Sequence, residues 1–543
     1  MDSPAHPVFN LEEVRRLRKC IPFLGLALIL SFVIVHDSSA ALVNRKISGL
    51  LPEFGDAGKY ELSPDGHYVV FYADRELDGV DDLYSVATTS ETPIRLNQPA
   101  LNSGETIYGF EIASDSQHVV YWLGQEGDMH PEVLYSVPIG GGTPLVLYQS
   151  EFAPNTHFHY IDDVQMIPNG QGVVFTIEYQ EGEDEVTKVL LTVPLSGGVP
   201  TQLFECSVCD LDFQITPNSL GVVYRCASYG PSTIEAIPIS GGEPVLLSDP
   251  PEPAYDFKIT PNSLGVVFTA ATTDPSTLEL YANYIGGGTP VKLSDPLLLG
   301  GAIEDFQITP NSQGVVYLTD EVVGEQFELY AAPITGGTRW KLNGALPDGG
   351  DVREFQITPN SLGVVYLADQ DVNDRQELYA VAIDGSTRYK LNDDLPYDGD
   401  VHEFQITPNS LGVVYLANQE DSGKQELYAT WITGGEKIKL NAPLPSGGRV
   451  QDFEITPNNM AVVYQADQLA YGRFELFSVL VTGVGRVKLN GGLISGGDVG
   501  DFQIFPDSQG VVYLADQDID DQHELFVTIN QQEVKVYLPI VTQ

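Results

Sequence analysis

The sequence predicts an all-β protein, a β-propeller of ten four-stranded repeats that each span about 49 residues. One phrase recurs at nearly constant spacing, and each copy is accompanied by short strand-like runs. No segment between residues 42 and 543 has a sustained helical period with caps. Four short strands in every ~40–50 residues are typical of propeller blades.

The recurring phrase is most regular in the second half of the chain. Residues 355–369 and 404–418 are identical except at their last position. From Pro261 to Pro506 the phrase returns every 49 residues, whereas the earlier spacings are 50, 54, 49 and 44. The ten units are centred on Pro64, Ser114, Pro168, Pro217, Pro261, Pro310, Pro359, Pro408, Pro457 and Pro506.

The unit around Pro359 shows the four predicted strands. Glu354–Thr358 alternates apolar and polar residues, as a half-buried strand does. Val364–Ala368 is apolar on both faces, which is typical of a strand between two packed layers. Glu377–Ile383 and Arg388–Leu391 complete the predicted sheet.

The turns divide the predicted ring into two faces. Residues 359–363 form a tight turn in which Gly363 is expected to take a positive φ, and Asp384-Gly385 closes a hairpin. These short turns share one face, which we call the turn face. The long loops between second and third strands share the opposite face with the connectors between units, and we call this the loop face. Binding residues favour variable loops on a rigid frame, so the loop face is the predicted binding face.

A strand of the fourth type precedes the first complete unit. Residues 46–55 match residues 390–399, and such a strand is expected to complete the last blade of a ring. Residues 533–538 offer a competing strand for the same place. A Pro-rich break at residues 249–253 would divide the units into rings of four and six. Because this break is too short for a linker, one continuous ring is favoured over two smaller rings.

The N-terminal region predicts export. Four basic residues between positions 15 and 19 precede an apolar run, Cys20–Val35, and the small residues Ser38 to Ala41 stand at a cleavage position. This order is a secretion signal, with cleavage expected after Ala40 or Ala41 and an uncleaved anchor as the alternative. Residues 1–41 are therefore the predicted signal peptide or anchor, and residues 42–543 the propeller. The protein is expected to be secreted or held in the cell envelope, touching a membrane only through an uncleaved N-terminal segment.

The chain is strongly acidic, with 75 acidic and 27 basic residues and a formal net charge of −48. Such a surface repels nucleic acid and anionic lipid and suits cations, basic partners or simple solubility. The predicted binding residues lie in two loops and are Asp369, Asp371, Asp374, Glu377, Asp516, Asp518, Asp520, Asp521 and Glu524. Connectors add Asp348, Asp351, Asp393, Asp394, Asp398, Asp400, Asp498 and Asp501.

These carboxylates have two interpretations. Alternating carboxylates can collect Ca²⁺, which takes about six to eight oxygen ligands. The loops lack the complete calcium-loop pattern, however, and the same residues suit ordinary solvated turns. Calcium is therefore an optional ligand, and the sequence requires no cofactor.

Cys206, Cys209 and Cys226 lie within one repeat. Export permits one disulfide and an odd thiol, with the pairing left open. A lone Cys-x-x-Cys is a weak signal for metal or redox chemistry, so a structural role is expected.

The first unit contains Ser63-Pro64-Asp65-Gly66 followed by Asp82-Leu83-Tyr84. With these residues the repeats resemble the TolB-type, WD40-like propeller family, which implies a propeller over nearly all of residues 42–543. Most later units have Pro-Asn-Ser in place of Pro-Asp-Gly. The additional α/β domain of TolB has no counterpart between Ala41 and Pro64. Prolyl oligopeptidase-like and tricorn-like proteases join such a propeller to a hydrolase domain, which requires a Gly-x-Ser-x-Gly turn that this sequence lacks.

The favoured functional prediction is a non-catalytic scaffold that binds a protein or an extracellular polymer, and no nucleic acid, through its acidic loop face. The alternative is a metal-dependent enzyme acting on extracellular polymers, either polysaccharide lyase-like or a hydrolase. Its weak metal-ligand candidates are His157 and His159, two apart on a predicted strand, and His130 in a neighbouring loop. Spaced histidines of this kind are more often surface residues. The serines repeated in the turns are expected to be structural.

Overall fold

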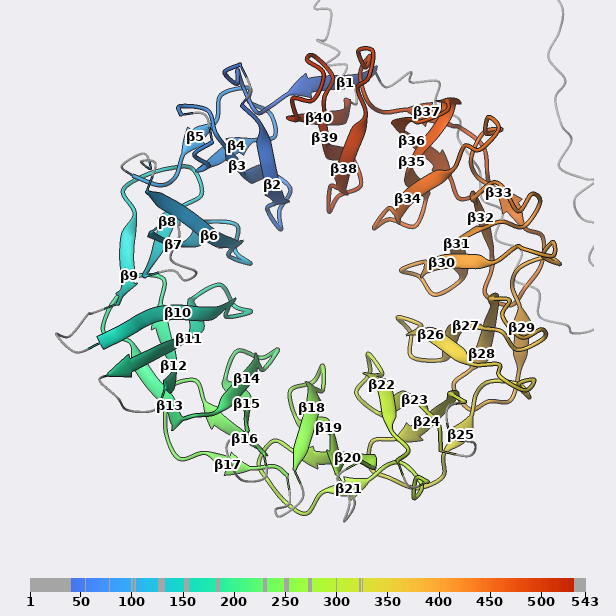
Figure 1. Cartoon of the computed structure of the whole chain (residues 1–543), viewed down its shortest axis with the longest axis horizontal. Coiled ribbons are helices and arrows are strands. Elements are labelled where there is room, and N and C mark those ends of the chain that lie inside the picture. The colour runs from blue at the N-terminus through green and yellow to red at the C-terminus, as the bar shows by residue number, and fades with distance from the viewer. Residues whose placement is uncertain are drawn as a thin grey trace, which may run out of the picture. The chain divides into compact units, whose positions relative to one another are not determined.

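The computed structural model describes residues 41–53, 55–77, 79–98, 101, 104–125, 132–150, 156–181, 186–227, 232–248, 253–271, 276–298, 300–321, 324 and 326–531. Within this part of the chain, forty strands form ten four-stranded antiparallel sheets. The sheets stand as blades around one centre (Figure 1). The prediction of an all-β, ten-bladed propeller in one continuous ring is confirmed. These residues contain no helix that could cross a membrane.

In each blade the strands follow one another from the centre of the ring outward (Figure 1). The inner strands are β2 (Ala57–Leu62), β6 (Glu105–Ile112), β10 (Thr156–Met166), β14 (Asp210–Ile215), β18 (Ala254–Ile259), β22 (Ile303–Ile308), β26 (Val352–Ile357), β30 (Val401–Ile406), β34 (Val450–Ile455) and β38 (Val499–Ile504), which define blades 1 to 10. The second strands are β3 (Tyr68–Ala73), β7 (His118–Gln125), β11 (Gly172–Glu181), β15 (Gly221–Ala227), β19 (Gly265–Ala271), β23 (Gly314–Thr319), β27 (Gly363–Ala368), β31 (Gly412–Ala417), β35 (Ala461–Ala470) and β39 (Gly510–Ala515).

The two remaining strands of each blade lie farther from the centre. The third strands are β4 (Asp82–Ala87), β8 (Val133–Pro138), β12 (Thr187–Pro194), β16 (Thr233–Pro238), β20 (Leu278–Tyr284), β24 (Glu328–Pro333), β28 (Glu377–Ala382), β32 (Glu426–Trp431), β36 (Arg473–Leu480) and β40 (Glu524–Gln531). The outer strands are β5 (Ile94–Arg95), β9 (Leu145–Gln149), β13 (Thr201–Ser207), β17 (Val245–Leu246), β21 (Val291–Lys292), β25 (Trp340–Lys341), β29 (Arg388–Lys390), β33 (Ile438–Lys439), β37 (Val487–Lys488) and, for blade 10, β1 (Ala41–Lys46).

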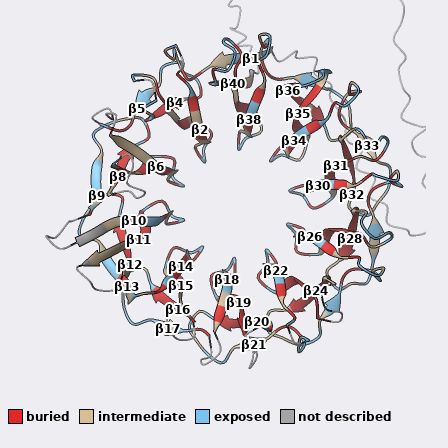
Figure 2. Ribbon diagram, viewed as in Figure 1, coloured by how far each residue is buried: buried red, intermediate tan, exposed pale blue. Residues whose placement is uncertain are grey.

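The core lies between neighbouring blades. All residues of β27 after its first are buried, as the apolar second strand predicts. Val364 and Tyr366 pack toward blade 6, whereas Val365 and Leu367 pack toward blade 8. Buried residues gather in the middle strands of the blades (Figure 2). Each second strand therefore contributes to two apolar layers, which holds consecutive blades together.

The turn-face conformation differs from the prediction. Ser361, not Gly363, takes the left-handed conformation, with φ of 62°. Gly363 begins β27, where an added Cβ would lie 3.1 Å from the carbonyl oxygen of Val381. The expectation for Gly363 is thus wrong, because this glycine is needed for a close backbone approach. Gly66 of the first unit, with φ of 72°, occupies the position that serine takes in most later units.

A hydrogen bond between blades explains why a serine tolerates this conformation. The hydroxyl of Ser361 accepts the backbone N–H of Asn311 in the preceding blade at 3.0 Å. The same contact joins Asn262 to Ser312 and Asn360 to Ser410, each at 3.0 Å. A glycine would avoid the steric cost of a positive φ but would have no hydroxyl. The repeated serines are therefore structural, as predicted.

We expect Ser361→Ala to lower the free energy of unfolding by about 1–2 kcal/mol, because it removes the hydrogen bond and keeps the strained φ. Ser361→Gly should cost about 1 kcal/mol less, because glycine adopts this φ without a Cβ penalty. Urea denaturation measures both variants. Equal losses would show that the backbone conformation at Ser361 carries no strain.

The ring closes through β1. The last sheet has the order β1-β40-β39-β38, so the strand that precedes the first complete unit becomes the outer strand of blade 10. Asn44 donates to Thr528 Oγ1 at 2.8 Å, and the backbone N–H of Ile47 donates to the carbonyl of Leu525 at 2.8 Å. Ile47 is fully buried beside Leu525 and Val527. Of the two closing strands considered, the N-terminal one is used.

Several predictions fall on residues that the structure does not describe. Residues 1–40, which include the predicted signal or anchor, lie outside the described residues, as do residues 533–538 and most of the Pro-rich break. The export of the protein and the cleavage after Ala40 or Ala41 stay predictions.

Candidate functional site

The predicted binding carboxylates of the loop face form two groups. Four of them are buried: Asp369, Glu377, Asp516 and Glu524. Five are exposed: Asp371, Asp374, Asp518, Asp520 and Asp521. The topology places both loops on the same face, but only the second group is accessible to a partner.

The buried aspartates hold their own loops closed. Asp369 accepts the N–H of Asp351 in the connector with one carboxylate oxygen and the N–H of Asp374, at 3.0 Å, with the other. Asp516 makes the same pair of contacts in blade 10, with Asp498 and Asp521. Since both oxygens are used, these residues are structural.

The buried glutamates are held by internal partners. Glu377 receives the Lys390 ammonium at 2.7 Å and the Tyr379 hydroxyl at 2.9 Å. Lys390 also contacts Asp371 at 3.0 Å, so it neutralises one exposed and one buried carboxylate. Lys46 joins Glu524 to Asp518 in the same way in blade 10.

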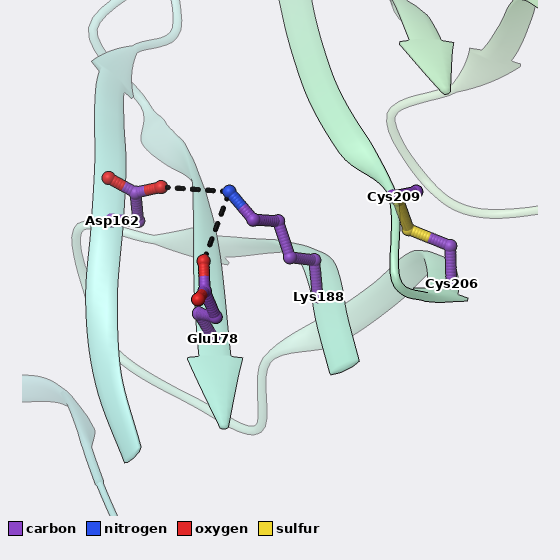
Figure 3. Close-up of a disulfide and its surroundings, with 5 residues drawn as sticks. All are labelled: Asp162, Glu178, Lys188, Cys206 and Cys209. Carbon is purple, nitrogen blue, oxygen red and sulfur yellow. Dashed lines mark hydrogen bonds and ion pairs between the residues drawn. A yellow bond between two sulfur atoms is a disulfide. The ribbon is translucent and has the colours of Figure 1, made fainter. Parts of the chain in front are cut away.

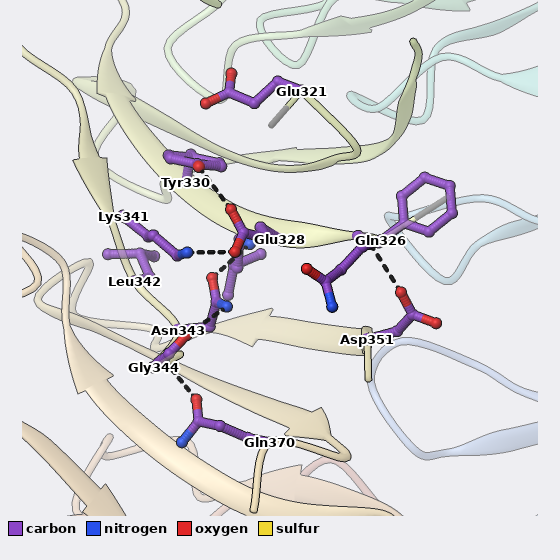
Figure 4. Close-up of polar contacts among 12 residues, drawn as sticks. Glu321, Gln326, Glu328, Tyr330, Lys341, Leu342, Asn343, Gly344, Asp351 and Gln370 are labelled. Carbon is purple, nitrogen blue, oxygen red and sulfur yellow. Dashed lines mark hydrogen bonds and ion pairs between the residues drawn. The ribbon is translucent and has the colours of Figure 1, made fainter. Parts of the chain in front are cut away.

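Blade 6 repeats this arrangement (Figure 4). Glu328 accepts from Tyr330 at 2.9 Å and from Lys341. The side chain of Asn343 accepts the backbone N–H of Leu329 at 2.9 Å, which ties the outer strand to the third strand. A buried glutamate paired with a lysine of the outer strand thus recurs at the loop face of blades 6, 7 and 10.

The connector aspartates also have structural contacts. Asp351 accepts the N–H of Phe327 at 2.8 Å, and Asp400 accepts the N–H of Gln376 at 2.8 Å, each from the preceding blade. Asp498 contacts Phe474 in the same way at 2.6 Å. Four more are exposed: Asp348, Asp393, Asp394 and Asp398.

The prediction that Asp501 lies in a connector is wrong, because this residue lies in the inner strand β38. Eight consecutive blades carry a carboxylate at this position of the inner strand, directly before the buried Phe that repeats in these strands, or before Val164 in blade 3. None of the eight is buried. We call this set the inner acidic ring, and it comprises Asp163, Asp212, Asp256, Asp305, Glu354, Glu403, Asp452 and Asp501.

The members of the inner acidic ring act on one another. Burial raises the pKa of Glu403, and the charges of Asp452 and Glu354 in the two flanking blades raise it further. Burial and then Asp501 raise the pKa of Asp452, although an N–H from Phe453 acts against the shift. The neighbouring carboxylates thus make Glu403 and Asp452 harder to ionise.

Most of this ring has no cationic partner. Asp305 pairs with Lys258 at 3.0 Å, and Asp212 pairs with Arg225. Among the residues that the structure describes, the other six form no ion pair within 4.0 Å: Asp163, Asp256, Glu354, Glu403, Asp452 and Asp501. Unlike the buried loop glutamates, these six carboxylates have no cation beside them among the described residues. The inner acidic ring is therefore the strongest candidate for a binding site.

A second row of residues, two positions further along the inner strands, links the blades. Gln405 donates to the carbonyl of Phe453 at 2.8 Å and accepts the N–H of Ile455 at 3.4 Å. Gln307, Gln356 and four other residues donate to the equivalent carbonyl of the next blade. This row is a repeated hydrogen-bonded bridge between inner strands.

Glu454 takes the bridging position in blade 9. Its carboxylate accepts the N–H of Ile504 but has no proton to donate to a carbonyl. Burial and then the charges of Asp452 and Asp501 raise the pKa of Glu454 to about 7. A protonated Glu454 would reproduce the donor and acceptor pattern of the glutamines.

The histidine candidates are not assembled into a described site. His159 lies in β10 and contacts the hydroxyl of Tyr148 through Nε2 at 2.9 Å. His130 and the side chain of His157 lie outside the described residues. The alternative of a metal-dependent enzyme at these histidines stays a prediction.

The cysteines have a definite arrangement. Cys206 and Cys209 form a disulfide with a Cα–Cα distance of 6.1 Å (Figure 3). Cys226 is a free thiol. In the described part of the chain, three ligand atoms of Asp, Glu, His or Cys lie within 4.8 Å of one another only at these three cysteines. The acidic loops therefore show no comparable preformed cluster for Ca²⁺ there, and calcium binding stays a prediction.

Comparisons with known proteins identify no family for this chain. No family model and no curated protein matches the chain. A solved eukaryotic initiation factor has a TM-score of 0.45 and 12% identity, covering 73% of this chain and 91% of its own. A TolB from Agrobacterium tumefaciens has a TM-score of 0.27 and 16% identity, and the match covers 46% of this chain and 83% of that one. A dipeptidyl peptidase 4 from Porphyromonas gingivalis has a TM-score of 0.44 and 13% identity, and the match covers 79% of this chain and 58% of that one. Because the identities and the TM-scores are low, these likenesses assign no function to this chain.

Proposed function

We propose that the protein is a non-catalytic propeller scaffold that binds a basic segment of a partner protein at the inner acidic ring. The observation that supports this most is a set of six inner-strand carboxylates, four of them on the successive strands of blades 7 to 10, that form no ion pair with any described residue. Because several of them raise the pKa of a neighbour, their charges carry a cost in the free protein. A bound cation removes this cost and gains attraction from several carboxylates together.

The geometry favours an extended cation over a single metal ion. No three carboxylates of the ring gather within 4.8 Å in the described residues, whereas a hard cation such as Ca²⁺ needs its oxygen ligands in one small shell. Carboxylates distributed one per blade suit a chain that carries several ammonium or guanidinium groups. A lysine- or arginine-rich peptide segment has this chemistry.

The loop face is the other surface that could bind such a partner. Its exposed members, Asp374, Asp520 and Asp521 among them, remain accessible. Exchanging the whole 369–377 loop would be a poor test, because it would also remove the structural contacts of Asp369 and Glu377. Point substitutions at exposed positions separate binding from folding.

The test compares two variants with equal loss of charge. The ring variant carries Glu354→Gln, Glu403→Gln, Asp452→Asn and Asp501→Asn. The control variant carries Asp371→Asn, Asp374→Asn, Asp518→Asn and Asp520→Asn. Affinity for a fluorescent oligolysine peptide is measured by anisotropy at two salt concentrations, since exposed charge interactions weaken as salt rises.

We expect the ring variant to bind the peptide about tenfold or more weakly, since each ~1.4 kcal/mol lost is a factor of ten, and the control variant to change little. A large loss in the control variant alone would place the site on the loop face. Equal losses in both variants would mean that the peptide responds only to net charge. Either of these two results would contradict the proposal.

Two further assignments belong to this proposal. The Ser-Pro-Asp-Gly motif and its Pro-Asn-Ser variants support placing the repeats in the TolB-type, WD40-like family. The basic and apolar N-terminal region supports a location outside the cytoplasm, where a basic segment of a secreted or envelope protein would be the partner.

A further inference from the structure

Three cysteine side chains meet where blade 3 joins blade 4. Cys206 lies near the end of β13, the outer strand of blade 3, and Cys209 directly precedes β14. Cys226 lies in β15, where it is paired in register with Leu211. The three Sγ atoms lie within 4.8 Å of one another, although the cysteines come from two blades and the connector between them.

The local backbone explains this convergence. Only two residues, Val208 and Cys209, separate β13 from β14, and Val208 takes a left-handed φ of 53°, which is rare for a β-branched residue. Its N–H is fixed to the carbonyl of Val186 at 2.8 Å. This sharp turn brings the two cysteines of the Cys-x-x-Cys segment close enough to bond to each other.

Packing between the blades brings in the third cysteine. Phe204 and Tyr224, each two residues before a cysteine on the same strand, pack with ring centroids 4.4 Å apart. Side chains two apart on a strand share a face, so Cys206 and Cys226 extend this contact. Cys209 is buried and the other two are half-buried, within the apolar cluster of this junction.

We propose that the reduced protein binds one thiophilic metal ion of the Zn²⁺ type through Cys206, Cys209 and Cys226. The disulfide drawn in Figure 3 is the oxidised, metal-free state of this site. A thiol reductant converts the disulfide into two thiols and becomes a disulfide itself. Binding of the ion then releases three protons from three thiols. Three cysteine ligands with Cys-x-x-Cys spacing match known zinc sites, and the fourth position is open to water or an exchangeable ligand.

The test uses the full chain with Cys20→Ser, so that the three clustered cysteines are the only ones left. The protein is reduced, freed of reductant without oxygen, and titrated with Cd²⁺. Absorption from thiolate-to-cadmium charge transfer reports sulfur ligands and ignores ions held by carboxylates. The same titration is repeated on the oxidised protein and on variants that also carry Cys226→Ser or Cys206→Ser.

We expect one Cd²⁺ per reduced chain, no charge-transfer band in the oxidised chain, and binding weaker by about tenfold or more in each variant. Excess Zn²⁺ added first should shift the Cd²⁺ titration to higher Cd²⁺ concentrations, because the two ions compete for the same thiolates. Circular dichroism checks that the variants fold. If a variant does not fold, the comparison of the reduced and oxidised Cys20→Ser protein still tests the proposal. Absence of the band in the reduced chain would overturn the proposal. Unchanged affinity in Cys226→Ser would also do so, since it would leave a two-cysteine site. Peptide mapping that finds Cys226 in a disulfide would overturn its assignment as the free thiol.

Discussion

Removal of residues 1–47 should lower the free energy of unfolding by about 4 kcal/mol or more, whereas removal of residues 1–40 should have little effect. The longer deletion takes away β1, the outer strand of blade 10. It removes the fully buried Ile47, whose burial contributes about 2 kcal/mol. It also leaves Glu524, which is 1% exposed, without Lys46, and an unpaired buried charge costs about 3 kcal/mol.

A second effect should accompany this loss of stability. Without β1, the edge of β40 has no strand beside it, and an open edge pairs readily with another chain. The longer deletion is therefore expected to self-associate at concentrations where the shorter one is monomeric.

Urea denaturation and size-exclusion chromatography measure the two effects. A third variant that lacks residues 533–543 is a control, because β1 already occupies the edge that the competing segment would take. If this third variant lost stability and the 1–47 deletion did not, the assignment of the closing strand would be wrong.

Glu454→Gln should stabilise the protein above pH 7 and have no effect near pH 4. The pKa of Glu454 is raised from 4.5 to about 7 in the folded protein. Below pH 4.5 the side chain is protonated in both states, so its charge costs nothing. As the pH rises from 4.5 to 7 the unfolded chain releases the proton first, and stability falls until the folded pKa is passed.

Above pH 7 the full cost of the charged Glu454 is present. Since the side chain is only partly buried, we expect a gain of about 1–2 kcal/mol from glutamine, less than the full shift of the pKa would give. Glutamine also supplies the N–H that Gln405 uses toward the next blade. The converse substitution, Gln405→Glu, should destabilise at pH 8 and be nearly neutral at pH 4. Free energies of unfolding measured at both pH values test the pair. A pH-independent effect of Glu454→Gln would refute the assigned titration.

The ten blades could be predicted from the sequence because the repeated strand pattern reflects where each strand has to be buried. A strand such as Val364–Ala368, apolar on both faces, has to lie between two layers, and its copies every 49 residues repeat that requirement. The strand bounds agree closely, as in Arg388–Lys390 against the predicted Arg388–Leu391. The closing strand stayed open, because two segments had suitable patterns and only pairing in space distinguishes them.

The role of each carboxylate was much harder to predict. Composition cannot distinguish Asp369, which accepts two backbone N–H groups, from Asp374, which is exposed five residues later. That distinction depends on where the connector crosses the loop. The left-handed conformation of Ser361 could not be predicted from the sequence either. The hydrogen bond that accompanies it comes from a turn about fifty residues away.

The inner acidic ring could have been recognised from a repeated acidic residue in the sequence, which the alternation of strand residues does not explain. An acid precedes Phe-Gln-Ile, or a close variant of it, in seven consecutive units, from Asp212 to Asp501. Alternation explains a polar residue at that position, but it does not explain why the residue is always acidic. The meaning emerges only when the inner strands are arranged around one centre and the acids become electrostatic neighbours.

The most direct test of the central proposal, that the inner acidic ring keeps unpaired charge for a basic partner, is the melting temperature at pH 8 with and without oligolysine. It compares the wild type with the four-substitution ring variant. Without peptide, the ring variant should melt at the higher temperature, because neutral side chains remove the repulsion. Saturating peptide should raise the melting temperature of the wild type more than that of the variant, which binds the peptide about tenfold or more weakly, since a ligand stabilises the folded state in proportion to its binding. An equal rise in both proteins, or a less stable variant without peptide, would contradict the proposal.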